Sequence, residues 1–200
     1  MVRFKAIIFD LDGTLLVSNI DFKGIRSKLG VPEGESVLDF LDDLEESDRK
    51  EGHAFLNAVE RQAALGSIIH EGVEELFSWL NANRIRHGIL TRNTKETWDI
   101  IVSRFPFLNP DLLITRNCAP PKPKPESLSP FLEKWRVKPP EIVHVGDYLY
   151  DLELAEATGM HSVLMNDLGE NPFPTPCDGV VRNHAELMSY LETLEFQNSE

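Results

Sequence analysis

Hydrophobic positions along the chain gather into six short runs that are rich in β-branched and other apolar residues. These runs cover residues 6–9, 88–90, 112–114, 142–145, 162–165 and 179–181. A short run without polar alternation is typical of a strand that is buried on both faces. The pattern therefore predicts six buried strands.

Helical spacing of apolar residues occurs between most of these runs. It covers residues 73–80, 98–105 and 152–156. Strands that alternate with helices form a parallel sheet covered by helices on both faces. We therefore expect an α/β fold, a Rossmann-like three-layer α/β/α parallel sheet.

The connection that follows the first predicted strand, residues 10–72, is far longer than an ordinary loop. Within it, residues 33–51 hold nine acids and two bases around an apolar helical stripe, and residues 54–65 continue in a second helical pattern. We expect a small helical module over residues 18–70, inserted into a core made of residues 1–17 and 71–200. The acidic run is expected to be a solvated helix face rather than a metal site.

The composition argues against nucleic acid and membranes as binding partners. A formal net charge of −13 over 200 residues removes long-range attraction to nucleic acid or to an anionic membrane. The apolar run at residues 6–9 is too short for a signal peptide or a membrane span. The two cysteines, Cys118 and Cys177, lack the paired spacing of a zinc or redox motif. We therefore expect a cytoplasmic protein that binds neither nucleic acid nor membrane.

Two carboxylates follow the first predicted strand directly. Asp10 and Asp12 stand two residues apart, ahead of Gly13. In an extended backbone such residues point to the same side, which suits a nucleophile and an acid/base partner. The structural alternative is a strand-to-turn junction in which Asp12 only supports the turn.

The second and third candidate segments hold hydrogen-bond donors and a cation. Thr91, Arg92 and Asn93 follow the second predicted strand, where a hydroxyl and amides would donate to a phosphoryl oxygen. Lys122 stands between prolines that hold the chain extended. Each has a structural alternative, because Thr ends many strands and proline-rich loops often carry solvated lysines.

The fourth candidate segment follows the strand predicted at residues 142–145. Gly146 and Asp147 come next, and Asp151 lies four residues after Asp147 at the start of a helical stretch. The structural alternative for Asp151 is an acid at the N-terminus of a helix, where the helix dipole stabilises a negative charge. His144, within the strand, is expected to be a packed side chain.

Together, in this order, the four segments resemble the signature of the haloacid dehalogenase-like (HAD) superfamily, whose members are mostly phosphohydrolases. The resemblance spans residues 4–190 and implies that the inserted module is the helical cap of that family. It implies that Asp10 is the nucleophile, that Asp12 is the acid/base and that Lys122 contacts the transferring phosphoryl group. Lys124 falls on a variable position of the motif.

The resemblance also implies a substrate site and a metal site. The substrate-binding residues would be Thr91, Arg92 and Asn93. The metal ligands would be the side chains of Asp10 and Asp147 and the backbone carbonyl of Asp12, with Asp151 orienting Lys122 or a metal-bound water. Independently of the family, clustered carboxylates repel one another and need a cation, and an oxygen-only ligand set favours Mg²⁺.

The sequence therefore predicts a Mg²⁺-dependent phosphatase that cleaves a small-molecule phosphomonoester through an aspartyl-phosphate on Asp10. The dehalogenase branch of the family lacks the second aspartate, so Asp12 favours phosphoryl transfer. Two alternatives remain open: a phosphomutase or phosphotransferase of the same family, and a non-catalytic regulatory binding protein on this scaffold.

Overall fold

The computed structural model describes residues 3–17 and 20–197, and its centre is a six-stranded parallel sheet of order β5-β4-β1-β6-β7-β8. In chain order the strands are β1 (Ala6–Phe9), β4 (Arg86–Leu90), β5 (Leu112–Ile114), β6 (Ile142–Gly146), β7 (His161–Met165) and β8 (Gly179–Val181). All six predicted strands are confirmed. The only differences are one or two extra residues at the ends of β4, β6 and β7.

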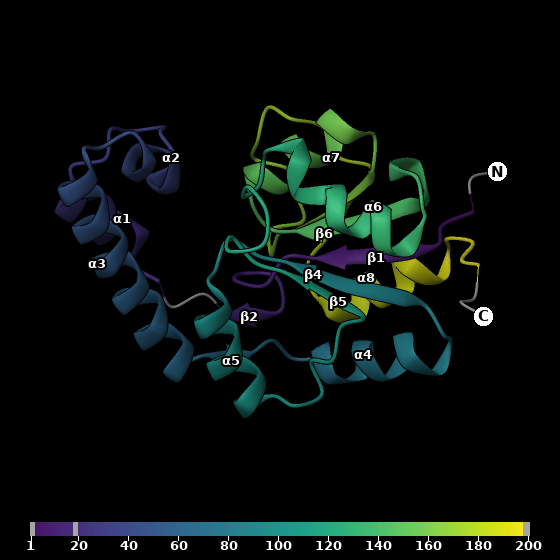
Figure 1. The fold of residues 1–200 in the computed structure, drawn as a ribbon. Helices are drawn as coiled ribbons and strands as arrows, with labels where there is room; N and C mark the ends of the chain where they lie inside the picture. The colour runs from purple at the N-terminus through teal and green to yellow at the C-terminus, as the bar shows by residue number, and fades with distance from the viewer. Residues whose placement is uncertain (1–2, 18–19, 198–200) are drawn as a thin grey trace.

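Helices cover both faces of this sheet (Figure 1). One face carries α4 (Val73–Ala82), α5 (Lys95–Arg104) and α8 (His184–Glu192), and the other carries α6 (Ser129–Trp135) and α7 (Leu149–Thr158), with short 3₁₀ turns at Pro125–Leu128 and Pro139–Glu141. Alternation along β1 explains the two layers. Ile7 and Phe9 pack into one hydrophobic cluster, while Ala6 and Ile8 pack into the other. The predicted three-layer α/β/α fold is confirmed.

Three helices stand apart from the sheet at one side of the molecule (Figure 1). They are α1 (Phe22–Leu29), α2 (Val37–Asp42) and α3 (Glu46–Leu65), and we refer to residues 22–65 as the cap. The cap has a small core of its own, formed by Ile25, Leu38, Leu41 and Leu56. Its size means that it depends on the main domain for stability. The predicted start of the module at residue 18 lies outside the described residues, and its predicted end at residue 70 stays a prediction.

A two-stranded antiparallel ladder lies where the cap joins the core. It pairs β2 (Leu16–Val17) with β3 (Ile68–Ile69). Two-residue strands have no periodicity, so the sequence analysis did not find them. In the part of the chain that the structure describes, no helix has the length and apolar character that a bilayer crossing requires. The cytoplasmic location stays a prediction.

Candidate active site

The candidate site lies at the carboxyl ends of three neighbouring strands, β4, β1 and β6. Asp10 follows β1, Thr91 follows β4 and Asp147 follows β6. The chain order of the strands reverses at β1, and ligands of open parallel sheets bind at such a reversal. The sheet therefore brings three of the four predicted motifs to one place.

Lys122 supplies the fourth motif and is buried between two carboxylates. Its Nζ lies 2.5 Å from Oδ1 of Asp10 and 2.7 Å from Oδ1 of Asp151, and the residue is only 2% exposed. Burial alone would lower the pKa of Lys122, but the attraction of the two carboxylates outweighs burial and raises it. Lys122 is therefore a fixed cation that touches the candidate nucleophile.

Asp151 is held by three donors. Lys122 Nζ and His144 Nε2 lie 2.7 and 3.1 Å from its Oδ1, and the backbone amide of Tyr148 donates to its Oδ2 at 3.2 Å. Burial opposes ionisation of Asp151, yet Lys122 and His144 outweigh burial and hold its pKa well below the usual range. Nδ1 of His144 in turn lies 3.2 Å from the carbonyl oxygen of Ile8. Asp151 is thus held as an ionised group in contact with Lys122.

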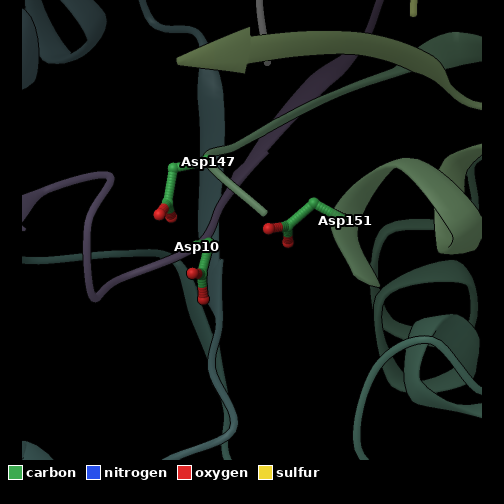
Figure 2. A group of neighbouring side chains, drawn as sticks. All are labelled: Asp10, Asp147 and Asp151. Carbon is green, nitrogen blue, oxygen red and sulfur yellow. The ribbon is translucent and has the colours of Figure 1, made fainter. Parts of the chain in front are cut away.

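Oxygen atoms of Asp10, Asp147 and Asp151 come within 4.8 Å of one another (Figure 2). Burial, followed by the charges of Asp10 and Asp151, raises the pKa of Asp147 to about 8. The pKa of Asp10 is also raised, chiefly by burial. Crowded carboxylates with raised pKa values fit a hard divalent cation, which would restore their ionised forms.

The predicted metal ligands Asp10 and Asp147 lie together in this cluster, and Asp151 is the third carboxylate beside them. The side chain of Asp12 points elsewhere, because its Oδ2 accepts a hydrogen bond of 2.5 Å from Nδ2 of Asn93. A ligand role for the Asp12 carbonyl and the orienting role of Asp151 stay predictions.

Two glycines allow the acids to approach the backbone closely. At Gly13, where φ is +85°, an added Cβ would lie 2.1 Å from Oδ2 of Asp147. At Gly146, an added Cβ would lie 2.1 Å from Cγ of Asp151. Thr14, next to Gly13, donates to Oδ1 of Asp147 at 2.9 Å. The glycines of the first and fourth motifs are therefore required by the positions of these carboxylates.

Asp12 has the properties of an acid/base group. Burial raises its pKa to about 7, with further contributions from the charges of Asp10 and Glu60. The hydrogen bond from Asn93 partly offsets this effect. A carboxyl group with a pKa close to neutrality can donate and accept a proton at physiological pH.

The residues of the second motif, Thr91, Arg92 and Asn93, also line the site. Thr91 is 2% exposed, and its Oγ1 accepts a hydrogen bond of 3.1 Å from the amide of Asn93. Arg92 donates to the carbonyl of Lys122 and, at 2.7 Å, to Oγ of Ser36 in the cap region. Its guanidinium lies 4.3 Å from the ring centre of Tyr150. Arg92 therefore connects the core, the fourth motif and the cap.

The sequence analysis missed an ion pair between cap and core. Arg116, which follows β5, places its two terminal nitrogens 2.7 Å from the two carboxylate oxygens of Glu60, and both side chains are 9% exposed. A signal was present in the sequence. Glu60 lies in a row of buried positions four residues apart on α3, with Leu56 before it and Ala64 after it. A charge on a buried helix face needs a partner.

A cavity of about 510 Å³ lies between the core and the cap. Its walls include every predicted site residue: Asp10, Asp12, Thr91, Arg92, Asn93, Lys122, Asp147 and Asp151. The size is within the range of small-molecule pockets, about 300–1,000 Å³. The four motifs and the cap thus enclose one chamber.

The raised pKa values predict how stability without metal depends on pH. Asp12 and Asp147 have a reference pKa of 3.8 and folded values of about 7 and 8, so the folded state binds more protons than the unfolded state up to about pH 8. Stability must therefore fall as pH rises through this window. His184, with a pKa lowered to about 4 by burial, has the opposite slope below its reference value of 6.5. The effect of Asp12 and Asp147 on stability is therefore best measured between about pH 6.5 and 8.5.

We expect the Tm measured in chelator to fall by roughly 5–10 °C across that window, which corresponds to about 2–3 kcal/mol for a domain of this size. Asp147→Asn is expected to flatten the fall, because the variant has no carboxyl to ionise there. A Tm that rises between pH 6.5 and 8.5 in the unmodified chain would contradict the assignment.

Comparison with known proteins identifies the family of this chain. A model of haloacid dehalogenase-like hydrolases matches residues 4–159, so the chain belongs to the haloacid dehalogenase-like hydrolase family. An uncharacterized hydrolase of Saccharomyces cerevisiae is 31% identical, over 82% of this chain and 78% of that protein. An N-acetylmuramic acid 6-phosphate phosphatase of Pseudomonas aeruginosa is 24% identical, over 96% of both chains. A hydrolase structure from Pseudomonas syringae superimposes with a TM-score of 0.77 at 19% identity and covers 94% of this chain and 98% of its own.

Proposed function

We propose that this hydrolase is a Mg²⁺-dependent phosphatase that cleaves a small-molecule phosphomonoester through an aspartyl-phosphate on Asp10. The observation that carries the proposal is the setting of Asp10. It touches the buried cation Lys122, shares a carboxylate cluster with Asp147, and lies close enough to Asp12 to raise the pKa of that acid. A nucleophile, a fixed positive charge and a neutral-range acid are the parts that phosphoryl transfer requires.

In the first step a carboxylate oxygen of Asp10 attacks phosphorus, and the bond from phosphorus to the alcohol oxygen breaks. Asp12, protonated near neutral pH, gives its proton to the departing alcohol. In the second step Asp12 takes a proton from a water molecule, which attacks phosphorus and releases phosphate and Asp10. Lys122 and the donors at Thr91 offset the negative charge on the transferring group.

The side chains of Asp10 and Asp147 and the carbonyl of Asp12 would hold Mg²⁺. When bound, the ion offsets the mutual repulsion of the carboxylates and the charge of the phosphoryl oxygens. Asp151 positions Lys122 through the 2.7 Å contact between them. Arg92 and Asn93 complete the substrate-binding set, and Asn93 also fixes the carboxyl of Asp12. The relative named N-acetylmuramic acid 6-phosphate phosphatase supports the choice of phosphomonoesters.

Phosphate release from a panel of phosphomonoesters, with and without Mg²⁺, tests the proposal. A chelator is expected to lower the rate at least about a hundredfold, because a bound metal ion contributes several kcal/mol to such reactions. Added Mg²⁺ should restore the rate. Hydrolysis that is equally fast in chelator would contradict the metal assignment, and no hydrolysis of any ester would favour the regulatory alternative.

A further inference from the structure

Arg26 of α1 lines the cavity from the cap side and forms no ion pair with a described residue. It donates to the backbone carbonyls of Pro32 and, at 2.6 Å, of Glu35. Glu35 also lines the cavity, but Arg26 contacts the carbonyl of that residue rather than its carboxylate. Two of the five N–H groups of this guanidinium are therefore used by neutral oxygens, and its charge is not balanced by a bonded acid.

Arg92 lines the same cavity from the core side, and it too forms no ion pair with a described residue. Its two hydrogen bonds go to the carbonyl of Lys122 and, at 2.7 Å, to Oγ of Ser36. Burial lowers the pKa of Arg92 more than the surrounding acids raise it. The carboxylate that acts most on Arg92 is that of Asp39, which is itself paired with Lys124 at 2.7 Å. A cation in this setting is stabilised by an anion that binds to it directly.

Tyr150 of the fourth motif lies beside both arginines. The guanidinium carbon of Arg92 is 4.3 Å from the centre of its ring. Burial raises the pKa of the Tyr150 hydroxyl, and the charges of Arg92 and Arg26 and a hydrogen bond with Ser36 act in the opposite direction. One cation from the core and one from the cap are thus close enough to this phenol to act on it. Two guanidinium groups and a hydroxyl in one cavity wall are a donor set that suits a carboxylate or a phosphate.

Two further cations line the cavity, and both are paired with acids. Arg116 has its terminal nitrogens 2.7 Å from the two carboxylate oxygens of Glu60. Lys122 lies between Asp10 and Asp151. Among the described residues that line the cavity, the cations without a bonded carboxylate are therefore the two arginines beside Tyr150.

We propose that the alcohol part of the substrate carries a second anionic group, a carboxylate or a phosphate, which binds to Arg26, Arg92 and the hydroxyl of Tyr150. The inference rests on the proposed phosphatase function and deepens it. The transferring phosphoryl group reacts beside Asp10 and Lys122, and we call this part of the cavity the phosphoryl end. Arg92 connects the two positions, because it contacts both the carbonyl of Lys122 and the ring of Tyr150. Charge-assisted hydrogen bonds from two guanidinium groups are roughly twice as strong as neutral ones, so they favour an anionic alcohol over an uncharged one.

The test compares linear alkyl phosphates that differ only in the group at the far end of the chain. A carboxylate is compared with its uncharged amide, and a second phosphate is compared with a hydroxyl, each with two and with four methylene groups. With Mg²⁺ present, kcat/KM for a charged ester should exceed that for its uncharged match at least about tenfold, the factor that one hydrogen bond to a charged group contributes. The pair with the larger ratio identifies the group as a carboxylate or a phosphate.

The outcomes separate this inference from the proposed function. Hydrolysis of the uncharged esters at rates equal to or above those of the charged ones, in both pairs and at both lengths, would overturn the inference while leaving the phosphatase function intact. No hydrolysis of any of these esters, or of a wider panel, would overturn the phosphatase function itself.

Variants locate the site of the second group. Arg26→Gln removes the charge and keeps a hydrogen-bonding side chain, so the ratio of kcat/KM for a charged ester to its uncharged match should fall at least about tenfold, whereas Arg26→Lys should retain part of it. Tyr150→Phe removes one hydroxyl and should lower the same ratio about threefold. Lys28→Gln is the matched control, because it makes the same change on the same helix at an exposed position that does not line the cavity.

Thermal melts show which variants are folded. An unchanged ratio in folded Arg26→Gln and Tyr150→Phe would overturn the inference. If Arg26→Gln does not fold, because its contacts with the cap loop are lost, Tyr150→Phe decides by the same criterion.

Discussion

Asp10→Asn is expected to lose phosphatase activity by at least about 10⁴-fold, the scale seen when a nucleophile is removed from an enzyme. The amide has nearly the shape of the carboxylate, but it carries no negative charge and does not form the aspartyl-phosphate. Lys122, which lies 2.5 Å from Oδ1 of Asp10, would then keep Asp151 as its one close carboxylate partner among the described residues. The variant should still bind the ester, since the other groups on the phosphoryl end remain.

The measurement is phosphate release under saturating Mg²⁺ with the best ester of the panel, together with a thermal melt. Asp167→Asn is the matched control, because it makes the same chemical change at an exposed position. The control should keep the full rate. Equal activity of Asp10→Asn and the unmodified chain, with both folded, would exclude the aspartyl-phosphate pathway.

Most of the fold was predictable because the sheet is buried on both faces. The runs of β1, β6 and β7 are short and mostly apolar, which is typical of strands buried on both faces. The helices α4 and α5 were visible from the spacing of residues that face the sheet. Local signals failed for α1, an eight-residue helix with a single buried residue, Ile25. Such a helix is fixed by tertiary contacts rather than by its own pattern.

The candidate site was predictable wherever a strand end fixes a side chain. Asp10 and Asp147 follow neighbouring strands, so a parallel sheet alone brings them together. Two contacts of these side chains were not predicted, although the buried row on α3 gave a signal for Glu60. His144 was expected only to pack, yet it is 3.1 Å from Asp151, and Arg116 reaches Glu60 across 56 residues of sequence. The pair of Arg116 and Glu60 depends on how the cap rests on the core.

The proline-rich segment has two lysines, and a direct test can show which of them is the lysine of the third motif. Lys122 is buried between Asp10 and Asp151, whereas the side chain of Lys124 is 46% exposed and pairs with Asp39 at 2.7 Å. Removing one partner of a buried ion pair leaves an uncompensated charge and typically costs about 3–5 kcal/mol. An exposed pair contributes about 0–1 kcal/mol. The same substitution at positions two residues apart should therefore have very different effects.

Lys122→Met is expected to lower the free energy of unfolding by about 3 kcal/mol when no metal is present, and the rate of phosphate release by at least about a hundredfold. Methionine keeps the length and apolar stem of lysine, so packing is largely retained and the loss reports on the charge. Without that charge, Asp10 and Asp151 repel each other, and the transferring phosphoryl group loses a fixed cation. Lys124→Met should change stability by no more than about 1 kcal/mol.

Urea unfolding in chelator measures the stability difference, and phosphate release with Mg²⁺ measures the rate. Added Mg²⁺ should recover part of the stability of Lys122→Met, because a cation beside Asp10 and Asp147 offsets the same repulsion, but it should not recover the rate. If Lys124→Met lost activity instead and Lys122→Met kept it, the register of the third motif would be shifted by two residues. The charge that faces Asp10 during the reaction would then have to come from the cap side, because Lys124 pairs with Asp39 of α2.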